Sequence, residues 1–373
     1  MKFDDFKLEV FFDKHEFSAP YLLTQSDCEA MSIKTLLEFE PGAEQEFLNT
    51  WLGYTQGRGN PELCREISKL YARLSPEDVV VHVGAQEAIF NFMNVLLEDK
   101  DHVITLTPAY QSLFGVAEAI GCKVSSWDMK QGKAGWELDM ELLEDMIQSN
   151  TKLICINTPN NPTGYTLTRE EMDQIANLAR QHGLYVFSDE VYRGLELSGQ
   201  KSNGFADIYE KAISLGVMSK AYGLAGLRIG WVASQDHELL EKMVKFKHYT
   251  SICSSSPSEF LARFALVHGE KILDKNRQII KKNLQISDDF FQKYSDLFQY
   301  NRPAAGPIAF HRMNMDQPIG EFCDQMVAEK GVLLLPAHIY SFAGNYFRMG
   351  YGRKDFKTCL AHFEEYLKEK HLI

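Results

Sequence analysis

Between residues 79 and 233 the chain alternates short apolar runs with longer amphipathic stretches. The runs have the length of buried strands, and the stretches between them place apolar side chains on one helical face. One of these helices is framed by Thr168 and Glu171, which form a capping box, and by Gly183 at its end. Such alternation predicts an α/β domain with a mostly parallel sheet flanked by helices. The predicted strands cover residues 79–83, 102–106, 123–127, 152–156, 184–188, 212–217 and 228–233.

The pattern changes after residue 236. A long amphipathic helix near 257–285 is followed by short strands that alternate with helices, which predicts a smaller α+β domain. We expect a large domain at 45–255. We expect the small domain to combine 256–373 with the N-terminal segment 1–44, and the long helix to link the two.

Composition narrows the classes of function. The formal net charge of −12 argues against a nucleic acid or an anionic membrane as partner. The seven cysteines include no CxxC pair, which favours reduced thiols over a disulfide framework or a zinc site, so no metal is expected. No apolar run approaches the roughly 20 residues that span a bilayer, and the acidic N-terminus lacks the apolar run of a signal peptide. These features predict a cytoplasmic protein.

Polar clusters follow several of the predicted strands. In a parallel sheet the carboxyl ends of the strands meet at one edge, where ligands bind. Any one of these side chains alone is more simply read as a satisfied polar group near the core. Their common position favours one shared site. The clusters are Gly84-Ala85-Gln86, Tyr110, Asn161, Asp189 with Tyr192, and Lys220.

Lys220 stands out because its neighbours are small or apolar and it directly follows an apolar strand. A partly buried ammonium is costly unless it is paired or deprotonated. The deprotonated amine is a nucleophile that can form a Schiff base. The alternative is a lysine at a strand end whose ammonium reaches solvent.

Together these residues suit pyridoxal phosphate (PLP). Lys220 supplies the Schiff-base amine, and Asp189 can keep the pyridine nitrogen protonated. Other residues can contact the ring and the phosphate of PLP through hydrogen bonds, aromatic stacking or charge. Asn161 and Tyr192 can bond the ring hydroxyl, Tyr110 can stack on the ring, the backbone N–H groups of Ala85 and Gln86 can hold the phosphate, and Arg228 can add a charged contact.

The sequence resembles fold-type I PLP-dependent enzymes, specifically the class I/II aminotransferases. The motifs that carry the resemblance occur in family order over roughly residues 50–352. They are YTQGRG at 54–59, GAQEA at 84–88, TPAY at 107–110, NTPNNPTG at 157–164, SDEVY at 188–192, SKAYGLAGLRIGW at 219–231 and FRMGY at 347–351.

The resemblance implies further roles. Lys220 would also act as the base of the proton shift, and Arg348 would bind the substrate α-carboxylate, with Asn161 close to it. Tyr54 would reach the cofactor phosphate of a second subunit, which implies a homodimer. Gly84 and Ser219 belong to the implied cofactor-binding set. The substrates would be an α-amino acid and a 2-oxo acid.

One position departs from the family pattern. Many members have Ser or Thr three residues before the lysine as a phosphate donor, and this chain has Val217. Loss of one charge-assisted donor costs about 1.5–3 kcal/mol. Gln86 is the candidate replacement.

Other readings stay open at this point. Another PLP-dependent reaction on the same scaffold is possible, such as β-elimination, C–S lysis or cyclisation, because residues 107–114 and 136–139 resemble capreomycidine synthase. A PLP-binding sensor of a DNA-binding regulator is disfavoured, because only about 50 residues precede Tyr54 and this segment is acidic, where a basic domain is expected. The substrate side chain is undetermined, and the candidates for lining its pocket are His15, Tyr21, His338 and Tyr340.

Overall fold

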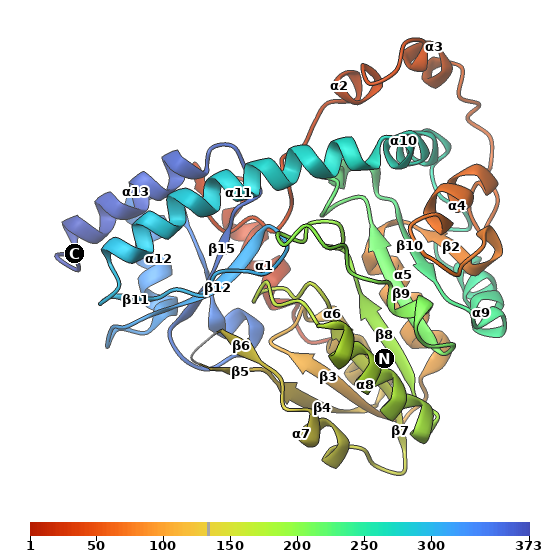
Figure 1. The fold of residues 1–373 in the computed structure, drawn as a ribbon, viewed down its shortest axis with the longest axis horizontal. Helices are drawn as coiled ribbons and strands as arrows, with labels where there is room; N and C mark the ends of the chain where they lie inside the picture. Colours follow the sequence, from red (N-terminus) through yellow and green to blue (C-terminus); the bar gives the residue numbers. More distant parts are fainter. Residues whose placement is uncertain (133–134) are drawn as a thin grey trace.

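The computed structural model describes residues 1–132 and 135–373, and it is built around a seven-stranded sheet (Figure 1). The strand order is β2–β10–β9–β8–β7–β3–β4. β10 is antiparallel to both of its neighbours, whereas the other adjacent pairs are parallel, so the mostly parallel sheet is confirmed. The strands are β2 (Val79–His82), β3 (His102–Thr107), β4 (Lys123–Asp128), β7 (Thr151–Asn157), β8 (Tyr185–Asp189), β9 (Ala212–Val217) and β10 (Gly230–Ala233).

Both faces of this sheet are buried except at the edge strand β4, which explains why the other strands are mostly apolar runs. Ile154 and Cys155 are neighbours on β7, yet they belong to hydrophobic clusters on opposite faces. One face is covered by α5 (Gly84–Leu96), α6 (Ser112–Ile120) and α9 (His237–Lys247). The other is covered by α7 (Met140–Asp145) and α8 (Arg169–His182), and α8 begins at the predicted Thr168–Glu171 capping box.

A smaller antiparallel sheet forms the second part of the molecule. Its order is β11–β12–β15–β14, and α11 (Gly269–Lys293), α12 (Ile319–Lys330) and α13 (Phe356–Glu369) pack beside it (Figure 1). The strands are β11 (Phe298–Gln299), β12 (Ile308–Met313), β14 (Leu335–Pro336) and β15 (Tyr346–Gly350).

Two expectations about this part need correction. The strand expected near 332–335 is divided, because β13 (Val332–Leu333) pairs with β1 (Tyr21–Leu22) while β14 pairs with β15. The single helix expected near 257–285 is two helices, α10 (Ser256–Val267) and α11. They separate at His268, whose backbone angles of φ −98 and ψ 18 are outside the helical range.

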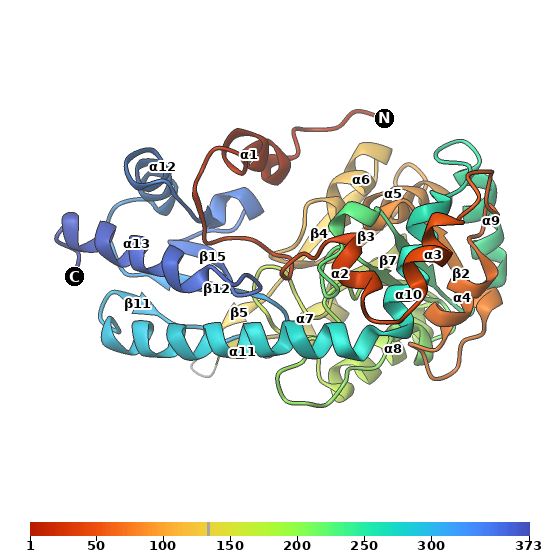
Figure 2. The same cartoon turned by 90° about the horizontal axis from the view of Figure 1, so that it is seen from above.

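The N-terminal helix α1 (Lys7–His15) contacts both parts of the molecule. The backbone N–H of Lys7 donates to Gln111 Oε1 at 2.9 Å, and Lys7 Nζ donates to Ser341 Oγ at 2.9 Å. Leu8, Phe11 and Phe12 form its buried face. Figure 2 shows α1 between α12 and α6. This segment therefore covers the edge of the large sheet as well as returning to the small one. No helix in the described ranges is long and apolar enough to cross a membrane.

Candidate active site

The carboxyl ends of the parallel strands open into a cavity of about 410 Å³. Most of the residues predicted for the site line it. These are Ala85, Gln86, Tyr110, Asn161, Asp189, Tyr192, Ser219, Lys220, Arg228 and Arg348. Gly84 lies beside the cavity at the first residue of α5, and Tyr54 lies outside it. The topology thus brings together side chains that are up to 263 residues apart, from Ala85 to Arg348.

Lys220 follows β9 and is half-buried in the cavity wall. Its Nζ donates a hydrogen bond to Ser26 Oγ at 3.0 Å. Burial lowers the pKa of the Lys220 ammonium; the Asp27 carboxylate opposes this effect and the Arg348 guanidinium adds to it. Burial therefore favours the neutral amine, the form that acts as a nucleophile.

Asp189 is the last residue of β8 and is 5% exposed. Its Oδ1 accepts a hydrogen bond from the backbone N–H of Val191 at 3.2 Å. Burial raises the pKa of the Asp189 carboxyl to about 7, against the opposing effects of that hydrogen bond and of the Lys220 charge. A buried carboxyl with this little compensation fits a cationic ligand group such as a protonated pyridine nitrogen.

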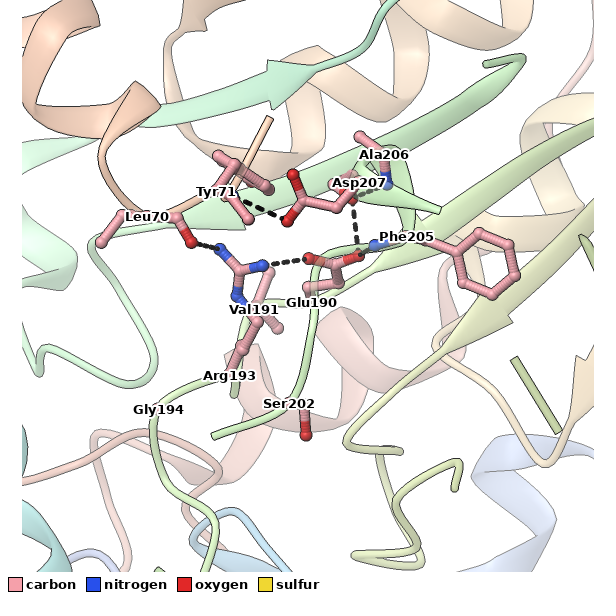
Figure 3. A network of polar contacts seen from close by, with 12 residues as sticks. Leu70, Tyr71, Glu190, Val191, Arg193, Gly194, Ser202, Phe205, Ala206 and Asp207 are labelled. Carbon is pink, nitrogen blue, oxygen red and sulfur yellow. Dashed lines mark hydrogen bonds and ion pairs between the residues drawn. The ribbon is translucent and has the colours of Figure 1, made fainter. Parts of the chain in front are cut away.

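A buried network supports the turn that carries Asp189 and Tyr192 (Figure 3). Arg193 and Glu190 form an ion pair at 3.2 Å. Glu190 Oε1 accepts hydrogen bonds from Ser214 Oγ at 2.6 Å and from the backbone N–H of Phe205 at 2.7 Å. The Arg193 guanidinium also donates to the Leu70 carbonyl and lies over the Tyr71 ring. Sequence reasoning missed this support, although Glu190 and Arg193 flank the residues it singled out.

The start of α5 has the features of a phosphate site. Gly84 has φ +79, and a Cβ built on it would approach Arg228 Nη2 to 2.7 Å. Arg228 Nη1 donates to the Ala225 carbonyl at 3.1 Å and to Ser219 Oγ at 3.4 Å. The guanidinium is therefore held directly over the first turn of the helix, where free backbone N–H groups and the helix dipole attract anions. This cradle fits the phosphate of PLP.

Gln86, the candidate to replace the hydroxyl that is missing at Val217, has a hydrogen-bond partner of its own. Val217 lines the cavity, as does Gln86. Gln86 Oε1 accepts a hydrogen bond from Ser112 Oγ at 2.7 Å. This bond fixes the amide of Gln86 and leaves its NH₂ group as the available donor. The compensating role of Gln86 stays a prediction.

Arg348 sits in the middle of β15 and is 1% exposed. Its Nε donates to the Thr24 carbonyl at 3.0 Å. Its Nη1 donates to the Tyr340 hydroxyl at 2.7 Å and to Asn161 Oδ1 at 3.2 Å. Its Nη2 is buried and has no hydrogen-bond partner among the described residues. A buried guanidinium with a free N–H edge beside a cavity fits a carboxylate ligand.

The N-terminal segment supplies cavity residues that sequence reasoning did not find. Tyr110 Oη donates to Glu9 Oε1 at 3.0 Å, and the Phe12 ring lies 5.6 Å from the Arg348 guanidinium carbon. Ser26 holds Lys220. The apolar spacing at residues 8, 11 and 12 would have predicted a helix, but no motif indicated where it docks.

The candidates for the substrate pocket have different positions. Tyr340 bonds Arg348 and Asn161, and so belongs to the wall behind the cavity. Tyr21 stacks on His362 with a centroid distance of 3.8 Å. His15 and His338 are not among the described residues that line the cavity.

Comparisons with known proteins agree with this geometry. The family model for aminotransferase class I and II matches residues 29–369. A PLP-dependent aminotransferase from Streptococcus suis superposes with a TM-score of 0.93 and is 32% identical, with 99% of each chain covered. A probable aspartate aminotransferase from Methanocaldococcus jannaschii is 26% identical over 312 residues, 81% of each chain.

A further relative has a name that does not denote an aminotransferase. Capreomycidine synthase from Streptomyces vinaceus is 26% identical over 299 residues, which cover 79% of this chain and 76% of that protein. The family match nonetheless extends over most of the chain. The chain belongs to the class I and II aminotransferases and is a PLP-dependent enzyme of that family.

Proposed function

We propose that the cavity transfers an amino group from an α-amino acid to a 2-oxo acid, with Lys220 as the residue that holds PLP. When bound, PLP supplies an electron-accepting ring that stabilises negative charge at the substrate Cα. Lys220 Nζ would accept the proton that leaves the substrate Cα and would act as the base of the proton shift. Burial supports this role because it favours the neutral amine, which alone can accept that proton.

The remaining residues bind and orient. Asp189 would keep the pyridine nitrogen of PLP protonated, Tyr192 and Asn161 would hydrogen-bond the ring hydroxyl, and Tyr110 would stack on the ring. The residues that would hold the phosphate are Gly84, Ala85, Gln86, Ser219 and Arg228. These assignments are supported by the cavity that most of these residues share and by the placement of the Arg228 guanidinium over Gly84.

The observation that carries the proposal is the free edge of Arg348. Its Nη2 is buried without a partner, while its other nitrogens are fixed by Thr24, Tyr340 and Asn161. Leaving a buried donor unsatisfied costs about 1–3 kcal/mol, and more for a charged group. A substrate α-carboxylate would satisfy it, which supports an amino acid and a 2-oxo acid as the two substrates.

We also propose that the enzyme acts as a homodimer. Large apolar side chains are exposed on and near the Tyr54 loop: Leu48, Trp51, Leu52, Tyr54, Tyr249 and Ile252. Tyr54 is 83% exposed. α2 (Ile33–Leu37) and α3 (Ala43–Leu48) extend beyond α10 at the upper edge of Figure 1. An apolar surface of this kind supports a protein partner, and a second copy would bring Tyr54 to the neighbouring phosphate.

The alternative is another PLP-dependent reaction on this scaffold, either elimination or cyclisation. It is supported by the similarity to capreomycidine synthase. Both classes require Lys220 and Asp189, so these residues do not discriminate between them.

The cytoplasm remains our proposed location, supported by the free thiols of all seven cysteines.

A half-reaction distinguishes transamination from the other PLP-dependent reactions. The purified protein loaded with PLP is mixed with single amino acids in the absence of any 2-oxo acid. Transamination produces at most one equivalent of 2-oxo acid per site and no ammonia, and further turnover then requires a 2-oxo acid acceptor. Continued release of ammonia without an acceptor would contradict the proposal and favour elimination.

A further inference from the structure

Three carboxylates that the proposed reaction does not use line the same cavity as Lys220 and Arg348. Glu9 comes from α1, and Glu16 and Asp27 come from the segments that follow it. The charges of Asp27 and Glu9 act on the Lys220 ammonium and raise its pKa against the effect of burial. All three carboxylates line the same cavity as the reacting amine, and the charges of Asp27 and Glu9 act on it.

Two of the three keep an oxygen open. Glu9 Oε1 accepts from Tyr110 Oη at 3.0 Å, and Glu16 Oε1 accepts from Gln25 Nε2 at 3.0 Å. Both bonds come from neutral donors, so neither cancels the carboxylate charge. Asp27 differs, because Arg353 Nη2 lies 2.9 Å from each of its oxygens. Glu9 and Glu16 are thus the carboxylates available to a ligand.

The cations that line the cavity already have assignments. Lys220 holds the cofactor, Arg228 lies over the phosphate cradle, and the free edge of Arg348 fits the α-carboxylate. Among the lining residues that the structure describes, no fourth lysine or arginine remains for a second carboxylate. Within this chain, a dicarboxylic substrate would therefore place its second charge among carboxylates of the same sign.

From this arrangement, and resting on the proposed transamination, we infer that the preferred amino donor has a cationic side chain, an ammonium or a guanidinium, received by Glu9 and Glu16. The unpartnered Nη2 of Arg348 fixes one end of the ligand, and the carboxylates of the N-terminal segment select the other. Opposite charges at the two ends orient the amino acid along the cavity. The named aspartate aminotransferases among the relatives would then differ from this chain in donor.

Ornithine and norleucine test the inference directly, because their side chains have the same number of heavy atoms and differ in charge. We expect the rate constant of the half-reaction at low substrate concentration to be about tenfold or more higher for L-ornithine than for L-norleucine, the ratio for one charge-assisted contact. L-Glutamate should be the slowest of the three. Glutamate or norleucine reacting as fast as ornithine would overturn the inference.

Variants of Glu9 and Glu16 test whether these carboxylates cause the preference for ornithine over norleucine. Glu9→Gln and Glu16→Gln keep an acceptor oxygen for Tyr110 and Gln25 but remove the charge, so each should lower the ornithine-to-norleucine ratio, and the double variant should bring it close to one. Asp13→Asn is the matched control, because Asp13 is an exposed carboxylate on α1 that is not among the described lining residues. A ratio that the double variant leaves unchanged would also overturn the inference.

Binding provides a readout that does not depend on turnover. α-Methyl amino acids lack the Cα hydrogen, so they bind without completing the transfer. Calorimetric titration should show about tenfold tighter binding of α-methylornithine than of α-methylnorleucine, and this preference should vanish in the Glu9→Gln, Glu16→Gln double variant. If no amino acid undergoes the half-reaction, the proposed function fails. The titration still decides the inference, because equal affinities for the two analogues would contradict it.

Discussion

At the scale of single residues, the site is a set of buried charges that the chain itself leaves incompletely compensated. Asp189 has a raised pKa, Lys220 a lowered one, and Arg348 a free buried nitrogen. Each condition destabilises the protein without a ligand. Several incompletely compensated buried charges in one cavity are typical of functional sites.

Arg348 should determine the affinity for the amino acid. In Arg348→Lys the charge remains but the planar guanidinium is lost, so the half-saturating amino acid concentration should rise at least about tenfold, as loss of a charge-assisted contact predicts. PLP affinity should be nearly unchanged. Stopped-flow absorbance measures the first quantity and equilibrium titration the second. Arg312→Lys, at an exposed position on β12, is the control. Unchanged amino acid affinity in Arg348→Lys would remove this residue from the site.

Asp189 should make the cofactor-free protein less stable as pH rises. Its folded-state pKa of about 7 is above the ordinary value of 3.8, so the folded state binds the proton more tightly than the unfolded state does. The stability from this group is complete below pH 4 and is lost as pH rises to 7. Cofactor-free Asp189→Asn should therefore unfold at a higher temperature than the parent at pH 8, by an amount equivalent to a few kcal/mol.

The same comparison at pH 5 tests whether the Asp189 carboxylate causes the difference in stability. There the advantage of the asparagine variant should shrink, because the parent carboxyl is mostly protonated. Thermal unfolding of both cofactor-free proteins at the two pH values measures the difference. A variant that is less stable than the parent at pH 8 would show that the carboxylate is satisfied by the chain alone.

At the scale of elements, α5 matters because its first turn faces the cavity beneath Arg228. In Gly84→Ala the new Cβ would displace the Arg228 guanidinium, which lies 2.7 Å from its position. The dissociation constant for PLP should rise about tenfold, the effect of one charge-assisted contact. Gly183→Ala is the matched control, because Gly183 also has positive φ but has no atom within 4 Å of its Cβ position.

The control separates backbone strain from loss of the cradle. Both alanine variants should lose about 1 kcal/mol of stability because their backbones favour glycine. Only Gly84→Ala should lose PLP affinity, measured by fluorescence titration of the cofactor-free protein. Equal PLP affinity in the two variants would show that Arg228 does not hold the phosphate.

The sequence predicted elements best where local pattern and topology agree. All strands expected between residues 79 and 233 are present. Most of them are buried on both faces and therefore require apolar runs, whereas the edge strand β4 is only partly buried. Their carboxyl ends converge, so motif residues on β3, β7, β8 and β9 could be placed at one edge without knowing any contact. Arg348 could be assigned only through the resemblance, because nothing local shows which residues an antiparallel β-strand at the end of the chain will face.

The N-terminal segment could not be placed from the sequence. Glu9, Ser26 and Asp27 reach the cavity through contacts such as Tyr110 to Glu9, 101 residues apart. Such docking depends on the surface offered by the folded remainder of the chain and has no local periodicity. The division of the expected strand near 332–335 has the same cause, because β13 exists through its pairing with β1.

At the scale of the whole molecule, the exposed apolar side chains around Tyr54 predict a shared active site. The 51–55 segment is attached to the 254–256 segment by Thr55 Oγ1 donating to the Ser254 carbonyl at 3.0 Å and Ser256 Oγ donating to the Trp51 carbonyl at 2.9 Å. Trp51 is 78% exposed and Tyr249 is 89% exposed. This surface should be buried in a dimer related by two-fold symmetry.

Mixed subunits test the shared site. Dimers of Tyr54→Phe and of Lys220→Ala each have a lesion in both sites. After subunit exchange, half of the sites in the mixed dimers should combine an intact Tyr54 with an intact Lys220, so activity should exceed the mean of the two parents. Sedimentation velocity confirms the dimer. Activity equal to that mean would indicate that each subunit contains its whole site.

Borohydride reduction of the protein loaded with PLP, followed by peptide mapping, identifies the lysine that holds the cofactor. Lys220 is the residue around which the cavity is arranged, and its burial favours the neutral amine. Our prediction is one phosphopyridoxyl group per chain, on Lys220, and its loss in Lys220→Ala. A phosphopyridoxyl group on another lysine, or on none, would contradict it.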